Sequence, residues 1–162
     1  MSGPGPRGEL LSGSAEATHA AGRRLAAALR GGERITLSGD LGAGKTCFVR
    51  GLAEGLGIAP EDVRSPSFPI LIPHESGRLP LYHIDLFRLP AGDIDSLSLR
   101  EYIYGPGVCA IEWPERLDEP MRDHLAITID FTAAGADARR LVAVAHGSGY
   151  EAAIGALLAA DC

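Results

Sequence analysis

Eight residues, GDLGAGKT from Gly39 to Thr46, contain the only lysine of the chain, and every other cationic side chain is an arginine. They match the pattern G-x-x-x-x-G-K-[ST], in which glycines let successive backbone N–H groups turn inward around a phosphate. A compact ammonium group fits such a narrow cradle, whereas a planar guanidinium is too wide. The segment therefore predicts a nucleotide-binding loop, with Lys45 on phosphate oxygens and the Thr46 hydroxyl on Mg²⁺. The alternative is a glycine-rich turn that binds nothing.

A magnesium triphosphate site also needs an acid at the end of a neighbouring strand. Glu112 directly follows the wholly apolar run 108–111, which is typical of a strand buried on both faces. Asp85 is the second candidate, and two-residue alternation places it on one strand face with His83. We expect one acid to hold the metal, directly or through water, and the other to activate the attacking water. The sequence leaves their assignment open, and a simple strand-end ion pair is the alternative for each. His83 could be only a packed hydrogen-bond partner of a carboxylate.

Two further positions are candidates for the same site. Ser67 lies in the segment SPSF, where many phosphate-loop enzymes keep a segment that senses the terminal phosphate, and it could touch metal or water. A plain turn is the alternative. Trp113 follows Glu112 and is the only tryptophan, so it is expected to pack at the strand end and to report nucleotide by its fluorescence. The residues expected to contact the nucleotide are Asp40, Leu41, Gly42, Ala43, Gly44, Lys45, Thr46, Cys47, Ser67 and Trp113.

The elements that must position these residues follow from hydrophobic periodicity. Helices are expected at 17–29, 45–56, 94–103 and 150–160, and strands at 34–38, 69–73, 79–87, 108–111, 125–131 and 140–146. The strand, loop and helix order around Lys45 predicts an α/β fold of the P-loop NTPase type, with three α/β/α layers around a central mixed, mainly parallel sheet. Residues 1–14 are rich in Gly, Pro and Ser and are expected to form a flexible leader before a single domain, 15–162.

The amino-acid composition indicates which kinds of ligand and which cellular compartment to expect. The formal net charge of −6 gives no basic stripe for nucleic acid, so any contact with RNA is expected to run through a partner. The chain has no asparagine, which removes the N-K-x-D type of guanine reader, and no glutamine, which removes the amide that orients the attacking water in several GTPases. Both absences favour an adenine nucleotide. Its three cysteines are odd in number and lack C-x-x-C spacing, which favours a reducing compartment. No apolar run approaches the roughly 20 residues that cross a bilayer, so we expect a cytoplasmic protein without a membrane partner.

Three segments beside the loop occur in a distinctive order: SPSF at 65–68, YHIDLFRL at 82–89 and EYIYGPGVCAIEWPERL at 101–117. Together with the loop they resemble the bacterial TsaE (YjeE) family, over about residues 17–140. The motif H-x-D-[LI]-[YF]-R followed by I-E-W-P-E is far more specific than the phosphate loop. The resemblance implies a P-loop ATPase of tRNA threonylcarbamoyladenosine biosynthesis, slow by itself, that uses ATP and Mg²⁺. It also implies TsaD-like and TsaB-like partners, which modify an adenosine beside the anticodon, with tRNA contacted only through the complex.

Carried over by position, the family places Lys45 on phosphate and both Thr46 and Glu112 at Mg²⁺. It places Asp85 near the γ-phosphate, as a ligand of metal-bound water or as a base. Two positions depart from the family pattern. Ser67 stands where the family often has threonine, which keeps a hydroxyl group. Phe87 stands where the family often has tyrosine, which removes a possible hydrogen-bond donor.

The leading hypothesis is thus an ATP-binding, slow and partner-activated ATPase for tRNA modification. A small-molecule kinase that uses Asp85 as the base is a second hypothesis. It lacks support from any arginine-rich lid segment in the sequence. A third hypothesis is a nucleotide-dependent scaffold in which ATP binding alone orders the segment 65–68 for docking, without hydrolysis.

Overall fold

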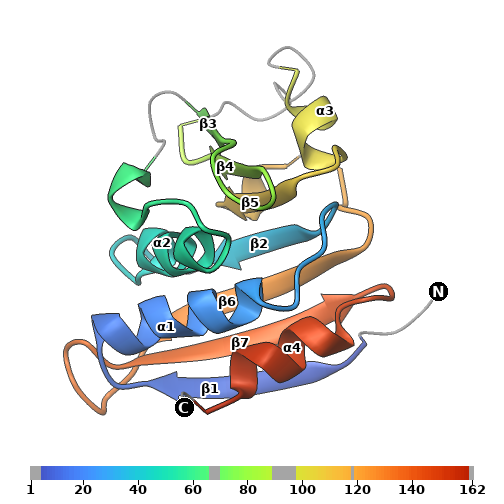
Figure 1. The fold of residues 1–162 in the computed structure, drawn as a ribbon. Helices are drawn as coiled ribbons and strands as arrows, with labels where there is room; N and C mark the ends of the chain where they lie inside the picture. The colour runs from blue at the N-terminus through green and yellow to red at the C-terminus, as the bar shows by residue number, and fades with distance from the viewer. Residues whose placement is uncertain (1–4, 66–69, 89–97, 118, 161–162) are drawn as a thin grey trace.

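The computed structural model describes residues 5–65, 70–88, 98–117 and 119–160 of the chain. Its centre is a mixed seven-stranded sheet with the order β1-β7-β6-β2-β5-β4-β3 (Figure 1). The strands from β6 to β4 are parallel to one another, whereas the outer strands join the two margins in antiparallel pairs. The strands are β1 (Arg7–Ser12), β2 (Arg34–Ser38), β3 (Leu71–His74), β4 (Leu81–Asp85), β5 (Val108–Glu112), β6 (His124–Phe131) and β7 (Arg139–His146).

Three helices cover one face of the sheet, and one short helix lies at its other side (Figure 1). The helices are α1 (Ala15–Ala26), α2 (Lys45–Gly55), α3 (Leu99–Ile103) and α4 (Glu151–Leu158). The main core lies between α1, α2 and α4 and the sheet, and it includes Leu25 and Phe48 from the helices and Ile35 and Ile127 from the strands. Burial of this apolar surface holds the helices on the sheet.

Helices α1 and α2 pack against each other through glycine. A Cβ atom added at Gly22 would collide with the carbonyl oxygen of Phe48, and one added at Gly51 would collide with that of His19. The two backbones therefore touch where side chains would normally separate them. The start of α1 is fixed as well, because the Ser14 hydroxyl accepts a hydrogen bond from the Ala17 amide at 3.1 Å.

The opposite face carries a smaller core beside β4 and β5. Tyr82, Ile84 and Ile111 of these strands pack there with Leu99 and Ile103 of α3. Every residue of β4 and of β5 is buried, because these two strands have neighbours on both faces. The predicted α/β fold with a mixed sheet and helices on both faces is confirmed, and so is the doubly buried strand at 108–111.

Most predicted elements are confirmed, with ends that differ by a few residues. Residues 75–80 join β3 and β4 in an antiparallel hairpin. The helix predicted at 94–103 is present from Leu99, and residues 94–97 lie outside the described part of the chain.

The flexible leader predicted at 1–14 is wrong for residues 7–12. These residues form β1, which pairs antiparallel with β7 along its whole length. The Gly-, Pro- and Ser-rich composition of residues 1–14 hid the strand, which pairing with β7 stabilises. Gly8 lies close against Ile154 and Leu158 of α4, which ties β1 to the helical layer.

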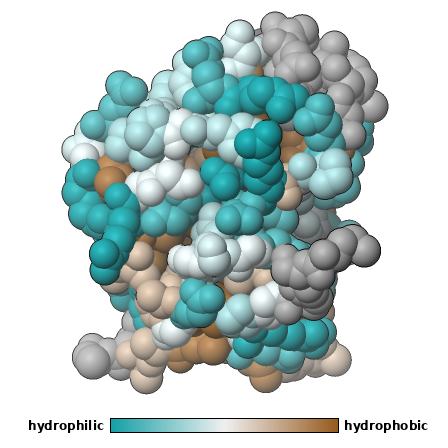
Figure 2. Space-filling model, turned by 90° about the vertical axis from the view of Figure 1, so that its right-hand side faces the viewer, coloured by the Kyte–Doolittle hydropathy of each residue, from teal (hydrophilic) through white to brown (hydrophobic). Residues whose placement is uncertain are grey.

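The surface gives two further observations. From the right-hand side of Figure 1, the molecule is mainly hydrophilic, with hydrophobic residues gathered toward the bottom of the view (Figure 2). Across the described ranges, none of the helices has the length and apolar character needed to cross a membrane.

Candidate nucleotide site

The glycine-rich loop connects the central strand β2 to the start of α2. Gly42 and Gly44 have φ values of 80° and 111°, which is the left-handed region that favours glycine. A Cβ atom at Gly39 would collide with the carbonyl oxygen of Ile129 on β6. Within the described residues no side chain caps the first turn of α2, so its N–H groups are available to an anion. The loop thus has the backbone conformation that the sequence pattern predicts.

Lys45 is buried at the inner side of this loop. Its Nζ atom donates hydrogen bonds to the carbonyl oxygens of Gly39 and Asp40, the second at 3.2 Å. The same atom lies 4.1 Å from the centroid of the Trp113 ring. Burial lowers the pKa of Lys45, and the nearby Glu112 and Asp85 carboxylates oppose this shift. The only ammonium side chain of the protein therefore faces two acids across the site.

The two predicted acids are neighbours at the carboxyl ends of adjacent strands. Strands β4 and β5 are parallel, and their register pairs Asp85 with Glu112. The Thr46 hydroxyl at the start of α2 donates to the Glu112 carboxylate, at 3.3 Å from Oε1 and 3.4 Å from Oε2. Hydroxyl and carboxylate oxygens are the ligands that Mg²⁺ prefers. Thr46 and Glu112 therefore fit a magnesium ion, with Asp85 beside them.

His83 is a buried neighbour of the same carboxylate. Its Nε2 atom lies 2.6 Å from Glu112 Oε2, and neither side chain is appreciably exposed. The buried Nδ1 atom of His83 has no hydrogen-bond partner among the described residues. An ionised carboxylate can only accept a hydrogen bond, so a bond between these two atoms has Nε2–H as the donor and orients Glu112. His83 was predicted on one strand face with Asp85, and its observed partner is the acid of the adjacent strand.

Asp85 is held by two hydrogen bonds. Its Oδ1 atom accepts from the Phe87 amide at 2.9 Å, and its Oδ2 atom accepts from the Ser65 hydroxyl at 3.2 Å. Burial raises the pKa of Asp85, the charge of Glu112 raises it further, and the two hydrogen bonds oppose the increase. A raised pKa makes this carboxylate a better proton acceptor than an exposed aspartate.

Trp113 closes the site from the end of β5. Its φ value is 61°, which is unusual for a residue with a large side chain. The ring packs against Phe87, with 4.9 Å between the ring centroids, and covers the Lys45 ammonium group. Backbone strain of this kind concentrates at functional sites.

These residues enclose a cavity of about 210 Å³. Its lining is Leu41, Gly42, Ala43, Gly44, Lys45, Thr46, Cys47, Ser65, Asp85, Glu112 and Trp113. The Asp40 carbonyl accepts a hydrogen bond from Lys45, while its exposed side chain does not line the cavity. The Cys47 thiol donates to the carbonyl of Ala15, and burial raises its pKa, which keeps it protonated. Ser67 lies outside the described residues.

Two residues around the site were not among the predicted contacts. Ser65 contacts Asp85 and belongs to the segment SPSF, which was predicted to reach the site. The prediction named Ser67 of that segment and not Ser65. Arg139, the first residue of β7, donates to the loop carbonyls of Ala43 and Gly42. Nothing in the sequence around Arg139 indicates this contact.

Comparisons with known proteins identify the family of the chain. A family model described as "Threonylcarbamoyl adenosine biosynthesis protein TsaE" matches residues 12–141. The chain is 43% identical over 137 residues to the tRNA threonylcarbamoyladenosine biosynthesis protein TsaE of Bacillus subtilis, covering 84% of each chain. It is 42% identical over 136 residues to the TsaE of Treponema pallidum, covering 83% of this chain and 98% of the relative. The crystal structure of YdiB from Bacillus subtilis superposes with a TM-score of 0.77 and 35% identity over 97% of both chains. The chain therefore belongs to the TsaE family.

Proposed function

We propose that this chain binds ATP with Mg²⁺ and hydrolyses it slowly, as a partner-activated subunit required for tRNA N6-threonylcarbamoyladenosine modification in the cytoplasm. The observation that carries the proposal is the meeting of Thr46, Glu112 and Asp85 beside the glycine-rich loop. The relatives that this chain matches at 42–43% identity are named for tRNA threonylcarbamoyladenosine biosynthesis. The preference for adenine rests on the absence of asparagine and glutamine from the sequence.

Each side chain has a proposed role in phosphate chemistry. The loop amides and the N-terminus of α2 bind the β-phosphate, and Lys45 exchanges the carbonyl groups of Gly39 and Asp40 for phosphate oxygens. Thr46 and Glu112 hold the Mg²⁺ ion, which supplies charge neutralisation and a fixed orientation of the terminal phosphates. Asp85 accepts the proton of the attacking water, and its raised pKa supports that role.

Partner activation is supported by exposed hydrophobic side chains at the rim of the cavity. Leu41 of the loop is 74% exposed, and Phe87, which packs on Trp113, is 38% exposed. Phe131, which packs on Arg139 beneath the loop, is 50% exposed. Large apolar side chains in such positions are typical of interaction sites. A TsaD-like or TsaB-like partner that covers this rim would exclude water and favour hydrolysis, with tRNA contacted through the complex.

The direct test is the content of threonylcarbamoyladenosine in total tRNA after depletion of the gene product. We expect the modified nucleoside to disappear, to return with the wild-type gene and to stay absent with Lys45→Ala. Unchanged modification after depletion would contradict the proposal.

Labelled ATP incubated with purified protein and a metabolite extract distinguishes the kinase hypothesis, because a kinase must transfer the label to an acceptor. Restoration by an Asp85→Asn variant that binds ATP without hydrolysing it would favour the scaffold hypothesis.

A matched pair of variants tests whether a partner stimulates ATP hydrolysis by binding at the rim of the cavity. Leu41→Glu places a charge at the rim, and Leu11→Glu places one at a leucine of similar exposure, 71%, on the edge strand β1. We expect Leu41→Glu to lower the ratio of the partner-stimulated ATPase rate to the rate of the isolated protein about tenfold, the effect of losing one well-buried interface contact. Leu11→Glu should alter neither rate. Equal stimulation of both variants would place the partner elsewhere on the surface.

A further inference from the structure

Arg139 binds the outer side of the phosphate loop. Its Nε atom donates to the carbonyl oxygen of Ala43 at 2.8 Å, and Nη2 lies 3.4 Å from the carbonyl oxygen of Gly42. On its other edge, Nη1 donates to the carbonyl oxygens of Ala136 and Ala138 at 2.7 and 2.9 Å. One guanidinium group therefore joins the loop to the turn between β6 and β7.

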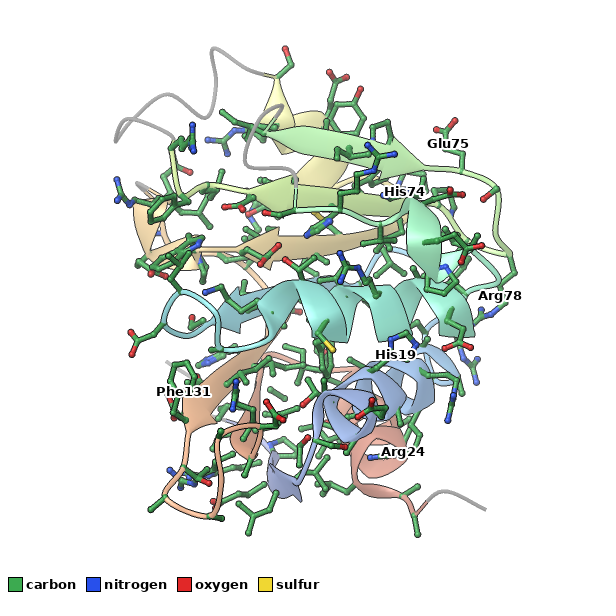
Figure 3. All side chains as sticks on the ribbon, turned by 90° about the vertical axis from the view of Figure 1, so that its left-hand side faces the viewer. His19, Arg24, His74, Glu75, Arg78 and Phe131 are labelled. Atoms are coloured by element: carbon green, nitrogen blue, oxygen red, sulfur yellow. The ribbon has the colours of Figure 1, made fainter. Side chains whose placement is uncertain are left out.

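The guanidinium is also held flat by an aromatic ring. The Cζ atom of Arg139 lies 4.4 Å from the centroid of the Phe131 ring, at the end of β6. Figure 3 shows Phe131 beside the loop that leads into α2, on the side of β6 and β7. Hydrogen bonds on both edges and a ring on one face leave the guanidinium little freedom to move.

The position of the bond explains how it could act on phosphate. A peptide unit is planar and trans, so its carbonyl oxygen and its N–H group point in opposite directions. The Ala43 carbonyl belongs to the same peptide unit as the Gly44 N–H, and Gly44 lines the cavity. When Arg139 holds that carbonyl outward, the Gly44 N–H must point inward. The positive charge also lies beneath the loop, where it favours an anion.

We propose that Arg139 is a positioning residue of the nucleotide-binding loop, which holds the Gly42–Gly44 backbone in the phosphate-binding conformation and links nucleotide affinity to the β6–β7 turn. This inference rests on the proposed nucleotide binding. A purely structural role for Arg139 would lower the thermal stability of the nucleotide-free protein and leave the affinity of the folded protein for nucleotide unchanged.

The neighbouring arginine is a matched control. Arg140 lies on the same strand, and its guanidinium pairs with Glu9 of β1 at 2.7 and 3.0 Å. Both partners of this pair are exposed, and exposed pairs contribute little to stability. Arg139→Ala and Arg140→Ala thus remove the same chemical group from adjacent positions, and only the first removes contacts to the loop.

The experiment is calorimetric titration of full-length wild type, Arg139→Ala, Arg139→Lys and Arg140→Ala with Mg·ADP, with melting temperatures of the nucleotide-free proteins. We expect Arg139→Ala to weaken binding about tenfold, the typical effect of losing a hydrogen bond to a charged group. Arg140→Ala should bind as the wild type does. Arg139→Lys should weaken binding almost as much, because an ammonium cannot hold both the loop and the turn. Added methylguanidinium should restore part of the affinity of Arg139→Ala.

The outcomes separate this inference from the proposed function. Wild-type affinity in Arg139→Ala, or an equal loss in Arg140→Ala, would overturn the role of Arg139 and leave nucleotide binding in place. Failure of the wild type to bind nucleotide would overturn both. If Arg139→Ala does not fold, Arg139→Lys decides the question, since wild-type affinity in that folded variant would contradict the need for two contacts.

Discussion

The phosphate loop and the pair of acids face the same cavity, yet the chain builds them in different ways. The loop is one uninterrupted segment, in which the left-handed conformations of Gly42 and Gly44 are local requirements. Asp85 and Glu112 come from separate strands and meet only because β4 and β5 are parallel and in register. A shift of one residue in that register would move one acid to the opposite face. The glycine conformations of the loop are therefore a local property of the sequence, whereas the meeting of the two acids is a property of the sheet.

The strongest test of this division is Asp85→Asn. We expect ATP hydrolysis in the presence of partners to fall about a thousandfold, within the usual range for loss of a general base. Nucleotide affinity should change less than about threefold, because the loop that binds phosphate is intact. Rates from phosphate release and affinities from calorimetry give the two numbers. A large loss of affinity together with rate would show that the acid and the loop do not act separately.

Changes in the loop should have the reverse pattern. Lys45→Ala should weaken nucleotide binding about a hundredfold, since it removes charge-assisted hydrogen bonds to phosphate. Lys45→Arg should also bind poorly, because the guanidinium is too wide for the space within the loop. Quenching of Trp113 fluorescence on nucleotide addition measures the nucleotide affinity of both variants. Wild-type affinity in Lys45→Arg would show that charge alone matters at this position.

His83 tests how the acid pair is held. We expect His83→Leu to reduce the apparent affinity for Mn²⁺ in the presence of ADP about tenfold, as is typical when the hydrogen-bond partner of a metal ligand is lost. His83→Gln keeps an N–H group that can reach Glu112, so it should recover most of this affinity. Electron paramagnetic resonance of free Mn²⁺ provides the measurement. Equal affinities in the two variants would assign His83 a packing role only.

The smallest expected effect is a pH-dependent gain in stability. Burial raises the pKa of Asp85 in the folded protein above its unfolded value, so its contribution to stability is present below the unfolded pKa and is lost as pH rises through the folded value. An asparagine side chain at this position cannot ionise. The nucleotide-free Asp85→Asn protein should therefore melt higher than the wild type at neutral pH, by a margin that shrinks toward about pH 4, the unfolded pKa. Scanning calorimetry of the two proteins between about pH 4 and pH 7 provides the measurement, and a margin that does not change with pH would contradict the prediction.

Sequence patterns over a few consecutive residues were enough to predict the parts of the candidate site that lie within one contiguous segment. Lys45 and Thr46 follow from the loop motif, and Glu112 follows from the apolar run of β5. Asp85 was predicted as the second acid of the same site, but its register directly opposite Glu112 depends on the strand order of the sheet, which no local pattern contains. The contact of Arg139 with the loop was beyond prediction for a related reason, since Arg139 and Arg140 are the same residue type and differ only in the side of β7 that each faces.

Local sequence was also a poor predictor of the strand at one edge of the sheet. The strands of the parallel centre are strongly apolar and were predicted from sequence. Residues 7–12 form β1 in an antiparallel pair with β7, a contact between segments more than 120 residues apart in the sequence, which local pattern does not predict. Family resemblance added the segment order, and the structure shows that Ser65 of that segment touches Asp85.

The glycine contacts between α1 and α2 have a mechanical consequence. At Gly22 and Gly51 the two backbones meet without an intervening side chain that could rotate to absorb a displacement. Any shift of α2 that accompanies closure of its first turn on a phosphate must therefore carry α1 with it as a rigid pair. Because α1 in turn packs on α4, a change at the nucleotide would reach the far margin of the molecule as a movement of whole helices.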